Sequence, residues 1–120
     1  MNAGQRLCPI LNPLFDNRVY PSKRMKGQDS SVPYAIYNQI TGNPETSQDG
    51  YTGHDWVRVQ IDIYAEYENE ADSLENQAKI LIATKIKPCD IGTTQHLTDG
   101  ELYRRSFDVE FFTEIPTPTP

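Results

Sequence analysis

A strict alternation of apolar and polar side chains runs through residues 56–65, which read WVRVQIDIYA. In an extended chain, successive side chains point to opposite faces, so every second residue of this stretch lies on the same side. The apolar set is Val57, Val59, Ile61 and Ile63, and the opposite set is Trp56, Arg58, Gln60, Asp62 and Tyr64. A period of two is typical of a strand that buries one face only, so residues 56–65 predict a central strand beside a hydrophobic core.

The residues that follow predict a long amphipathic helix. Asn69 is a suitable N-cap, and Glu70 and Asp72 lie where the dipole of the first turn favours acidic side chains. Pro88 ends the helical pattern. Between these limits an apolar stripe at spacings of three and four residues is expected to cover the sheet, and its members are Ala71, Leu74, Ala78, Leu81, Ile82 and Ile86.

Three further strands are predicted around this unit. Residues 32–41 are rich in aromatic and β-branched side chains, and residues 93–98 and 101–113 flank Asp99-Gly100, a dipeptide suited to a tight hairpin turn. Residues 42–53 contain one proline and three glycines and predict a polar loop. In the last strand, the residues assigned to the core are Tyr103, Phe107, Val109 and Phe111, and those on the opposite face are Arg104, Ser106, Asp108 and Glu110.

The N-terminal residues predict a short helix that is interrupted. Apolar side chains between Leu7 and Phe15 have helical spacing, but Pro9 and Pro13 forbid one continuous regular helix. Asn12 is a suitable cap for the second piece. Residues 21–31 lack periodicity and predict a surface loop.

The order of these elements predicts an α+β fold. An antiparallel sheet of about four strands would be covered on one face by the long amphipathic helix and by the short broken N-terminal helix. The chain has 120 residues, 37% of them apolar, which suffices for one core, so residues 1–115 are predicted to form a single domain. Residues 116–120 read PTPTP and predict a flexible, extended tail, either a frayed end or an arm that orders against a neighbouring subunit.

Charge and composition exclude several classes of protein. With 17 acidic and 11 basic residues the net charge is −6, and only Lys23, Arg24 and Lys26 cluster, so direct binding of nucleic acid is disfavoured against a solvated loop. No apolar run approaches the roughly 20 residues that span a bilayer. No signal-peptide core precedes Cys8, so synthesis in the cytoplasm and reduced thiols at Cys8 and Cys89 are expected.

The search for catalytic motifs yields no site. A phosphate-binding glycine loop, a dinucleotide fingerprint, a helical zinc motif and a serine nucleophile elbow are all missing from the sequence. His54-Asp55 lacks an identifiable nucleophile, and ion pairing explains Asp108 and Glu110 more simply than acid–base chemistry. The densest group of potential metal ligands matches no standard zinc spacing and comprises Cys89, Asp90, His96 and Asp99. We therefore expect no catalytic residue, no cofactor and no metal.

The second face of the predicted sheet carries charges of both signs. Opposite charges on neighbouring strands stabilise a solvated face, and the same side chains could form a subunit contact. The residues proposed to bind a partner are Trp56, Arg58, Asp62, Arg104, Asp108 and Glu110 on this face, with Lys23, Arg24 and Lys26 in the loop.

Three blocks of the sequence carry a resemblance to a known family. They are Arg18-Val19-Tyr20-Pro21, Val32-Pro33-Tyr34-Ala35-Ile36-Tyr37 and Val59-Gln60-Ile61-Asp62-Ile63-Tyr64-Ala65, the last leading into a helix. In this order, over residues 7–112, they resemble the tail-completion proteins of long-tailed bacteriophages and are similar in layout to tail terminators of the lambda type.

The resemblance implies a non-enzymatic structural protein of the virion. It would form a homo-oligomeric ring, usually a hexamer, on the head-proximal end of the tail, having assembled in the host cytoplasm. Its implied partners are the tail tube protein and the head–tail connector, and it would end tube polymerisation and provide the joining surface for the head. A small metal-binding enzyme and a host-cell adaptor domain remain as alternatives.

Overall fold

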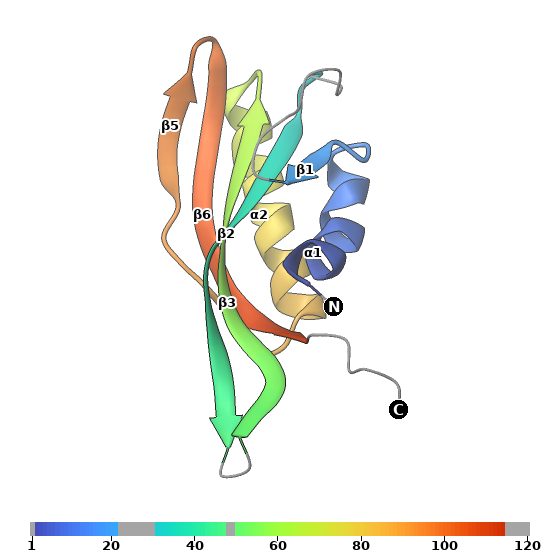
Figure 1. The fold of residues 1–120 in the computed structure, drawn as a ribbon. Coiled ribbons are helices and arrows are strands. Elements are labelled where there is room, and N and C mark those ends of the chain that lie inside the picture. The colour runs from blue at the N-terminus through green and yellow to red at the C-terminus, as the bar shows by residue number, and fades with distance from the viewer. Residues whose placement is uncertain (1, 22–30, 48–49, 115–120) are drawn as a thin grey trace.

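A computed structural model of the protein describes residues 2–21, 31–47 and 50–114. Two helices pack on one face of a single sheet, so the described chain forms two layers (Figure 1). The elements in chain order are α1 (Ala3–Leu11), the 3-10 turn η1 (Asn12–Leu14), β1 (Val19–Pro21), β2 (Tyr34–Ser47), β3 (Gly50–Ala65), α2 (Glu68–Lys85), β4 (Cys89–Ile91), β5 (Gln95–Asp99) and β6 (Leu102–Glu114). The predicted α+β class is confirmed.

The sheet differs in detail from the prediction, because it has six strands instead of about four. Its order is β1-β2-β3-β6-β4, and β5 also pairs with β6. The β1–β2 pair is parallel, whereas the other pairs are antiparallel. The strands missed from the sequence, β1 and β4, have three residues each, too few to show an alternating pattern.

Strands β2 and β3 form a much longer hairpin than predicted. Residues 42–53 were expected to form a loop, but all of them except 48 and 49, which lie outside the described residues, belong to a strand. Pro44 is tolerated because the register shifts beside it and because no described strand pairs with the outer edge of β2 beyond Tyr37. The end of this hairpin, residues 41–47 and 50–55, extends past the helices and is called the arm below (Figure 1).

The core lies between the sheet and the helices, as the alternating pattern predicts. The four apolar residues of β3, Val57, Val59, Ile61 and Ile63, are at most 1% exposed. Phe107, Val109 and Phe111 of β6 join them, whereas Tyr103 is only half-buried. Burying each large apolar side chain contributes about 1.5–3 kcal/mol, so these two strands and the helices above them provide the main driving force for folding.

Both helices begin or end differently from the prediction. The N-cap of α2 is Tyr67 and not Asn69, because the chain turns into the helix only two residues after β3 ends. The apolar stripe is correct: Ala71, Leu74, Ala78, Ile82 and Ile86 are buried, and Leu81 is partly buried.

The N-terminal helix is interrupted at Asn12, where α1 gives way to a 3-10 turn that contains Pro13. Pro9 was also expected to break the helix, but it lies inside α1, which continues to Leu11. Asn12 is the C-cap of α1 and does not cap the second piece, whose N-cap is Leu11. The side chain of Asn2 caps α1 by accepting a hydrogen bond of 2.8 Å from the backbone of Gln5. None of the helices described here is long and apolar enough to cross a membrane.

Candidate functional site

The candidate site is the face of the sheet that points away from the helices, called the open face below. The antiparallel register of β3 and β6 sets Trp56 opposite Phe112, Arg58 opposite Glu110 and Asp62 opposite Ser106. All six open-face residues predicted to bind a partner are thereby brought together on two neighbouring strands. They are Trp56, Arg58, Asp62, Arg104, Asp108 and Glu110. The basic cluster of Lys23, Arg24 and Lys26 lies outside the described residues.

A partly buried ion pair occupies one part of the open face. The Arg104 Nη2 atom lies 3.2 Å from the Asp62 Oδ2 atom, and the two side chains are 29% and 12% exposed. Gln60 donates hydrogen bonds to Asp62 at 3.1 Å and to the Ser106 hydroxyl at 3.1 Å. The guanidinium of Arg104 also lies 5.9 Å from the ring centre of Tyr64. This region is a connected polar network in which Asp62 is largely removed from water.

A more exposed ion pair lies farther along the same strands. The Arg58 guanidinium contacts the Asp108 carboxylate through Nε at 3.0 Å and Nη2 at 2.6 Å. Arg58 therefore pairs with the diagonal residue Asp108 and not with Glu110, which lies directly opposite it. Glu110 also faces Asp90 of β4, and neither acid has an ion-pair partner among the described residues. Like charges on facing positions destabilise a sheet, so this acidic pair is suited to an external cation.

Aromatic residues lie where the arm joins the body of the sheet. The rings of Trp56 and Phe112 meet edge to face, with centroids 4.7 Å apart and an interplanar angle of 73°. The ring of His54 also meets that of Phe112 edge to face, with centroids 6.5 Å apart and an interplanar angle of 75°. Both Trp56 and Phe112 are half-buried, so the two rings pack against each other while part of each stays exposed to solvent.

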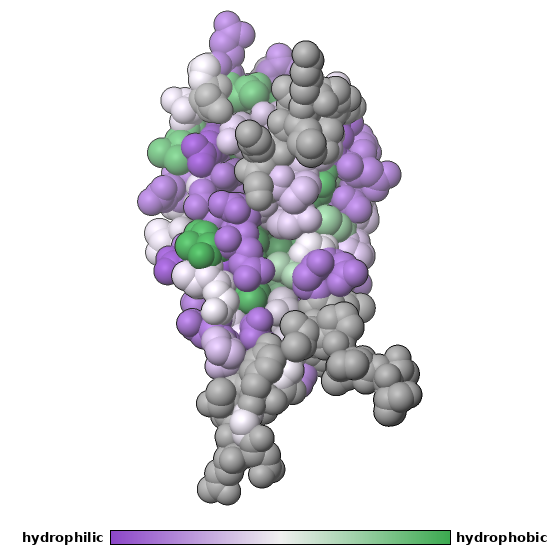
Figure 2. Space-filling view, viewed as in Figure 1, coloured by the Kyte–Doolittle hydropathy of each residue, from purple (hydrophilic) through white to green (hydrophobic). Residues whose placement is uncertain are grey.

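The surface in the view of Figure 2 is mainly hydrophilic. Apolar residues there stand singly or in small groups, without forming a broad patch on the described surface. Among the side chains whose exposure is described, the large apolar ones that are most exposed are Ile40, Tyr67, Ile80 and Leu97, and they belong to four different parts of the chain. Contacts on such a surface depend on charge and on a few aromatic anchors more than on bulk apolar area.

The other face of β6 holds a cluster of charges that sequence reasoning missed. Arg105 is only 3% exposed and lies against α2, where its Nη2 atom is 3.0 Å from Asp72 and 3.9 Å from Glu68. Glu75, one turn farther along, is 4.0 Å from the Arg105 Nε atom and 3.0 Å from Lys79. Thr94 accepts a hydrogen bond from Lys79 and joins the network. The sequence contains one indication of this cluster, because Arg105 lies on the side of β6 that carries the apolar residues Phe107, Val109 and Phe111.

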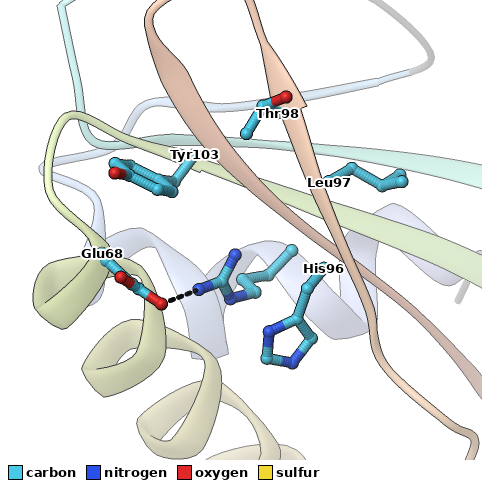
Figure 3. Close-up of a pocket in the computed structure, with 6 residues that line it drawn as sticks. Glu68, His96, Leu97, Thr98 and Tyr103 are labelled. Atoms are coloured by element: carbon cyan, nitrogen blue, oxygen red, sulfur yellow. Dashed lines mark ion pairs between the residues drawn. The ribbon is translucent and has the colours of Figure 1, made fainter.

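A shallow pocket of about 420 Å³ opens beside Arg105 (Figure 3). It lies between the start of α2 and the β5–β6 hairpin, and the Arg105–Glu68 ion pair crosses it. Its lining residues are Glu68, His96, Leu97, Thr98, Tyr103 and Arg105. The Arg105 guanidinium is held by three carboxylates of α2, so the pocket is primarily part of the contact between helix and sheet.

The residues considered for metal binding or catalysis are dispersed. Cys89 lies on β4 and His96 on β5, and they face different parts of β6. Within residues 2–21, 31–47 and 50–114, no three His, Cys, Asp or Glu side chains are placed to share a metal ion. His54 and Asp55 are successive strand residues and point to opposite faces, so they do not form an oriented pair.

The contact between α1 and β2 contains an ionisable group whose pKa is shifted. Burial raises the pKa of the Tyr37 hydroxyl above its usual value of 10.0, and the neighbouring Cys8 thiol raises it further. Tyr37 packs closely on Gly4, where a side chain of any size would collide with its ring. Cys8 and Cys89 are both free thiols. This contact is a packing feature, without the additional groups that acid–base chemistry needs.

Comparison with known proteins gives information about the fold. No protein-family model matches the sequence, and no curated protein matches it either. Among 29 solved chains of similar structure is one with a TM-score of 0.55 and 13% sequence identity. The match covers 97% of this chain and 92% of that one, whose name states no function. At this identity the likeness concerns the fold alone, and it extends over nearly all of both chains.

Proposed function

We propose that the protein is a structural component of a bacteriophage tail. In this proposal it forms a ring, usually of six copies, on the head-proximal end of the tail tube, ends polymerisation of the tube and presents a joining surface to the head connector. The single observation that carries the proposal is the open face, where charges of both signs and two aromatic side chains lie together on two strands. The sequence blocks at residues 18–21, 32–37 and 59–65 support it through their resemblance to tail terminators.

Groups of opposite charge in two parts of the chain support head-to-tail contacts. A ring needs two different patches on each subunit, which meet when one copy joins the next. Strands β1 and β4 are at opposite ends of the sheet order. The acidic pair of Asp90 and Glu110 lies at the β4 end, whereas Lys23 follows the last residue of β1 by two positions and begins the basic cluster. In the proposal, this acidic edge meets the basic residues Lys23, Arg24 and Lys26 of the next copy.

The arm provides a second type of contact. It is a hairpin of two paired strands, so its exposed residues are held at a distance from the core by backbone hydrogen bonds. Residues 41–44 are all exposed. In the proposal the arm and the 22–31 segment face the tube, the connector or the lumen of the ring.

Assembly on a template explains how a weakly associating subunit would form a ring only where it is needed. Docking on the tube end holds neighbouring copies at high effective concentration, which strengthens contacts that are weak in solution. Charge complementarity then selects the orientation and the rate of docking more than the final affinity. Tube growth ends because the upper surface of the ring differs from that of a tube subunit.

The test combines the purified protein with tail tubes and measures mass by light scattering, with tube ends viewed by electron microscopy. The wild-type chain is expected to form rings on tube ends, and Glu110→Lys is expected to reduce capping by about tenfold or more. Glu66→Lys is the matched control, because it makes the same change of charge at an exposed position in the turn between β3 and α2, outside the strands of the open face. Arg104 is a poorer probe, since its pairing with Asp62 also supports the fold.

Two outcomes would contradict the proposal. One is a wild-type chain that never caps tubes under conditions in which the tubes remain intact. The other is a phage that lacks the gene and still produces tails of normal length joined to heads. Equal capping by Glu110→Lys and Glu66→Lys would remove the acidic edge from the proposed contact.

A further inference from the structure

The half-exposed aromatic pair of Trp56 and Phe112 has the chemistry of a binding site for proline. The two rings are set edge to face, 4.7 Å apart, on a strand surface that no described helix covers. No described residue accepts a hydrogen bond from the indole N–H of Trp56. The pair therefore offers a flat apolar surface together with an available donor.

The other aromatic group on the open face is less suitable as a binding site. Tyr64 stacks on Tyr34 at 4.8 Å with nearly parallel rings, and Tyr20 lies 6.4 Å from Tyr34. Tyr20 and Tyr64 are only 9% and 8% exposed, so this cluster is already packed. Of these two aromatic groups among the described residues, the pair at the base of the arm is the one that can accept another molecule.

Segments in a polyproline helix are the ligands that fit such a surface. They have no internal hydrogen bonds, so their carbonyl groups can accept a bond from an indole N–H while a proline ring packs on the aromatic face. Because proline stiffens the free segment, docking costs less conformational entropy than docking of an ordinary peptide. The ligand expected here is therefore a short, uncharged, proline-rich segment.

The chain itself carries such a segment immediately after β6. Residues 115–120 read IPTPTP, with proline at every second position and no charged side chain. Each proline disfavours the helical region for the residue before it, so the sequence favours an extended conformation. Six residues of a polyproline helix span about 19 Å, enough to reach a neighbouring molecule.

The direction of β6 favours a second copy over the same chain. Glu114 pairs with His54, and Phe112 pairs with Trp56, so β6 moves away from the aromatic pair as it approaches residue 115. To lie on its own Trp56, the chain would have to reverse at once, where Pro116 favours an extended backbone at Ile115. We propose that residues 115–120 of one copy bind the Trp56–Phe112 pair of a second copy. This contact goes beyond the ring proposal, since it requires only two molecules.

The experiment uses the full chain and the fluorescence of Trp56, the one tryptophan among the 120 residues. As protein concentration rises, the emission is expected to shift to the blue while sedimentation shows self-association. The variant with Pro116→Ala, Pro118→Ala and Pro120→Ala is expected to associate about tenfold or more weakly and to lose the shift. A synthetic IPTPTP peptide added to dilute wild-type protein should reproduce the shift, and an IATATA peptide should not.

Circular dichroism and thermal unfolding provide the control for folding, because the substituted prolines lie beyond the core strands. Trp56→Ala removes the reporter, so its effect is read by sedimentation, where it should match the triple alanine variant. A fluorescence difference between wild type and triple variant that is independent of concentration would show docking within one chain and overturn the inference. So would unchanged association in both variants. Self-association of the triple alanine variant equal to that of the wild type, together with normal capping of tubes by both, would overturn this inference and leave the ring proposal standing.

Discussion

Two successive residues of β6, Arg104 and Arg105, allow the two faces of the sheet to be compared directly. Both side chains pair with carboxylates, at 3.2 Å and 3.0 Å, but they point in opposite directions. Arg104 lies on the open face and is 29% exposed, whereas Arg105 lies under α2 and is 3% exposed. The same chemistry is therefore placed in two different solvent environments, one residue apart.

The origin of their partners shows what each arginine does. Arg105 contacts acids from successive turns of one helix, Glu68, Asp72 and Glu75, so it holds α2 in position on the sheet. Arg104 pairs with Asp62 of the adjacent strand, a contact that the backbone register of β3 and β6 already supports. The inner arginine is thus needed for packing between layers, whereas the outer one adjusts a surface. Removing each should distinguish these roles.

The largest effect is expected for Arg105→Ala. Loss of the guanidinium leaves three acids of α2 without their common cation and removes the packing of its buried stem, which should cost about 3 kcal/mol of unfolding free energy. Urea denaturation followed by circular dichroism measures this loss. Arg105→Lys, which retains the charge without the planar fork, should recover part of it. A loss below about 1 kcal/mol would show that the inner network does not hold the layers together.

An intermediate effect is expected for the Arg104–Asp62 pair. Asp62 is 12% exposed and also accepts a hydrogen bond from Gln60. Loss of its arginine partner should therefore reduce the free energy of unfolding more than loss of the partner of a surface acid. A double-mutant cycle with Arg104→Gln and Asp62→Asn should give a coupling energy of about 1–2 kcal/mol. Additive effects of the two substitutions would place this pair with the surface charges and weaken the comparison of the two arginines.

The smallest effect on stability is expected for the Arg58–Asp108 pair. Arg58 is 50% exposed, so solvent screens the contact despite its short distance of 2.6 Å. The cycle with Arg58→Gln and Asp108→Asn should give about 0–1 kcal/mol, decreasing further in 1 M salt. A coupling as large as that of Arg104 and Asp62 would mean that exposure does not decide the strength of pairs on the open face.

The sequence was sufficient for the parts of the fold that rest on long periodic patterns. The alternation in residues 56–65 predicted the buried set of β3, and the three-and-four spacing predicted the buried stripe of α2. It failed for β1 and β4, whose three residues pair only because longer neighbours are already in place. It also failed for the arm, where proline and glycine suggested a loop although register shifts accommodate them within a hairpin.

The candidate site could be predicted as a set of residues but not as a set of contacts. Alternation placed Arg58, Asp62, Arg104 and Asp108 on one face, because face depends only on residue parity. Which acid each arginine contacts depends on the pairing register and on side-chain reach, and Arg58 takes the diagonal Asp108 over the facing Glu110. Arg105 was missed because it lies at a position where the alternation predicts an apolar side chain. Its acidic partners are on α2, and the sequence alone does not show where this helix packs on the sheet.

The outer edge of β2 has a consequence for the behaviour of the separate chain. Beyond Tyr37 no described strand covers this edge, which would ordinarily invite a passing strand to add to the sheet. Two breaks in register, between Gln39 and Thr41 and between Pro44 and Thr46, distort the backbone there, and Pro44 lacks a donor. The hydrogen-bond ladder between this edge and an added strand would be interrupted every few residues. This irregularity disfavours fibrous aggregation of the newly made chain, while its side chains stay available to a matching surface.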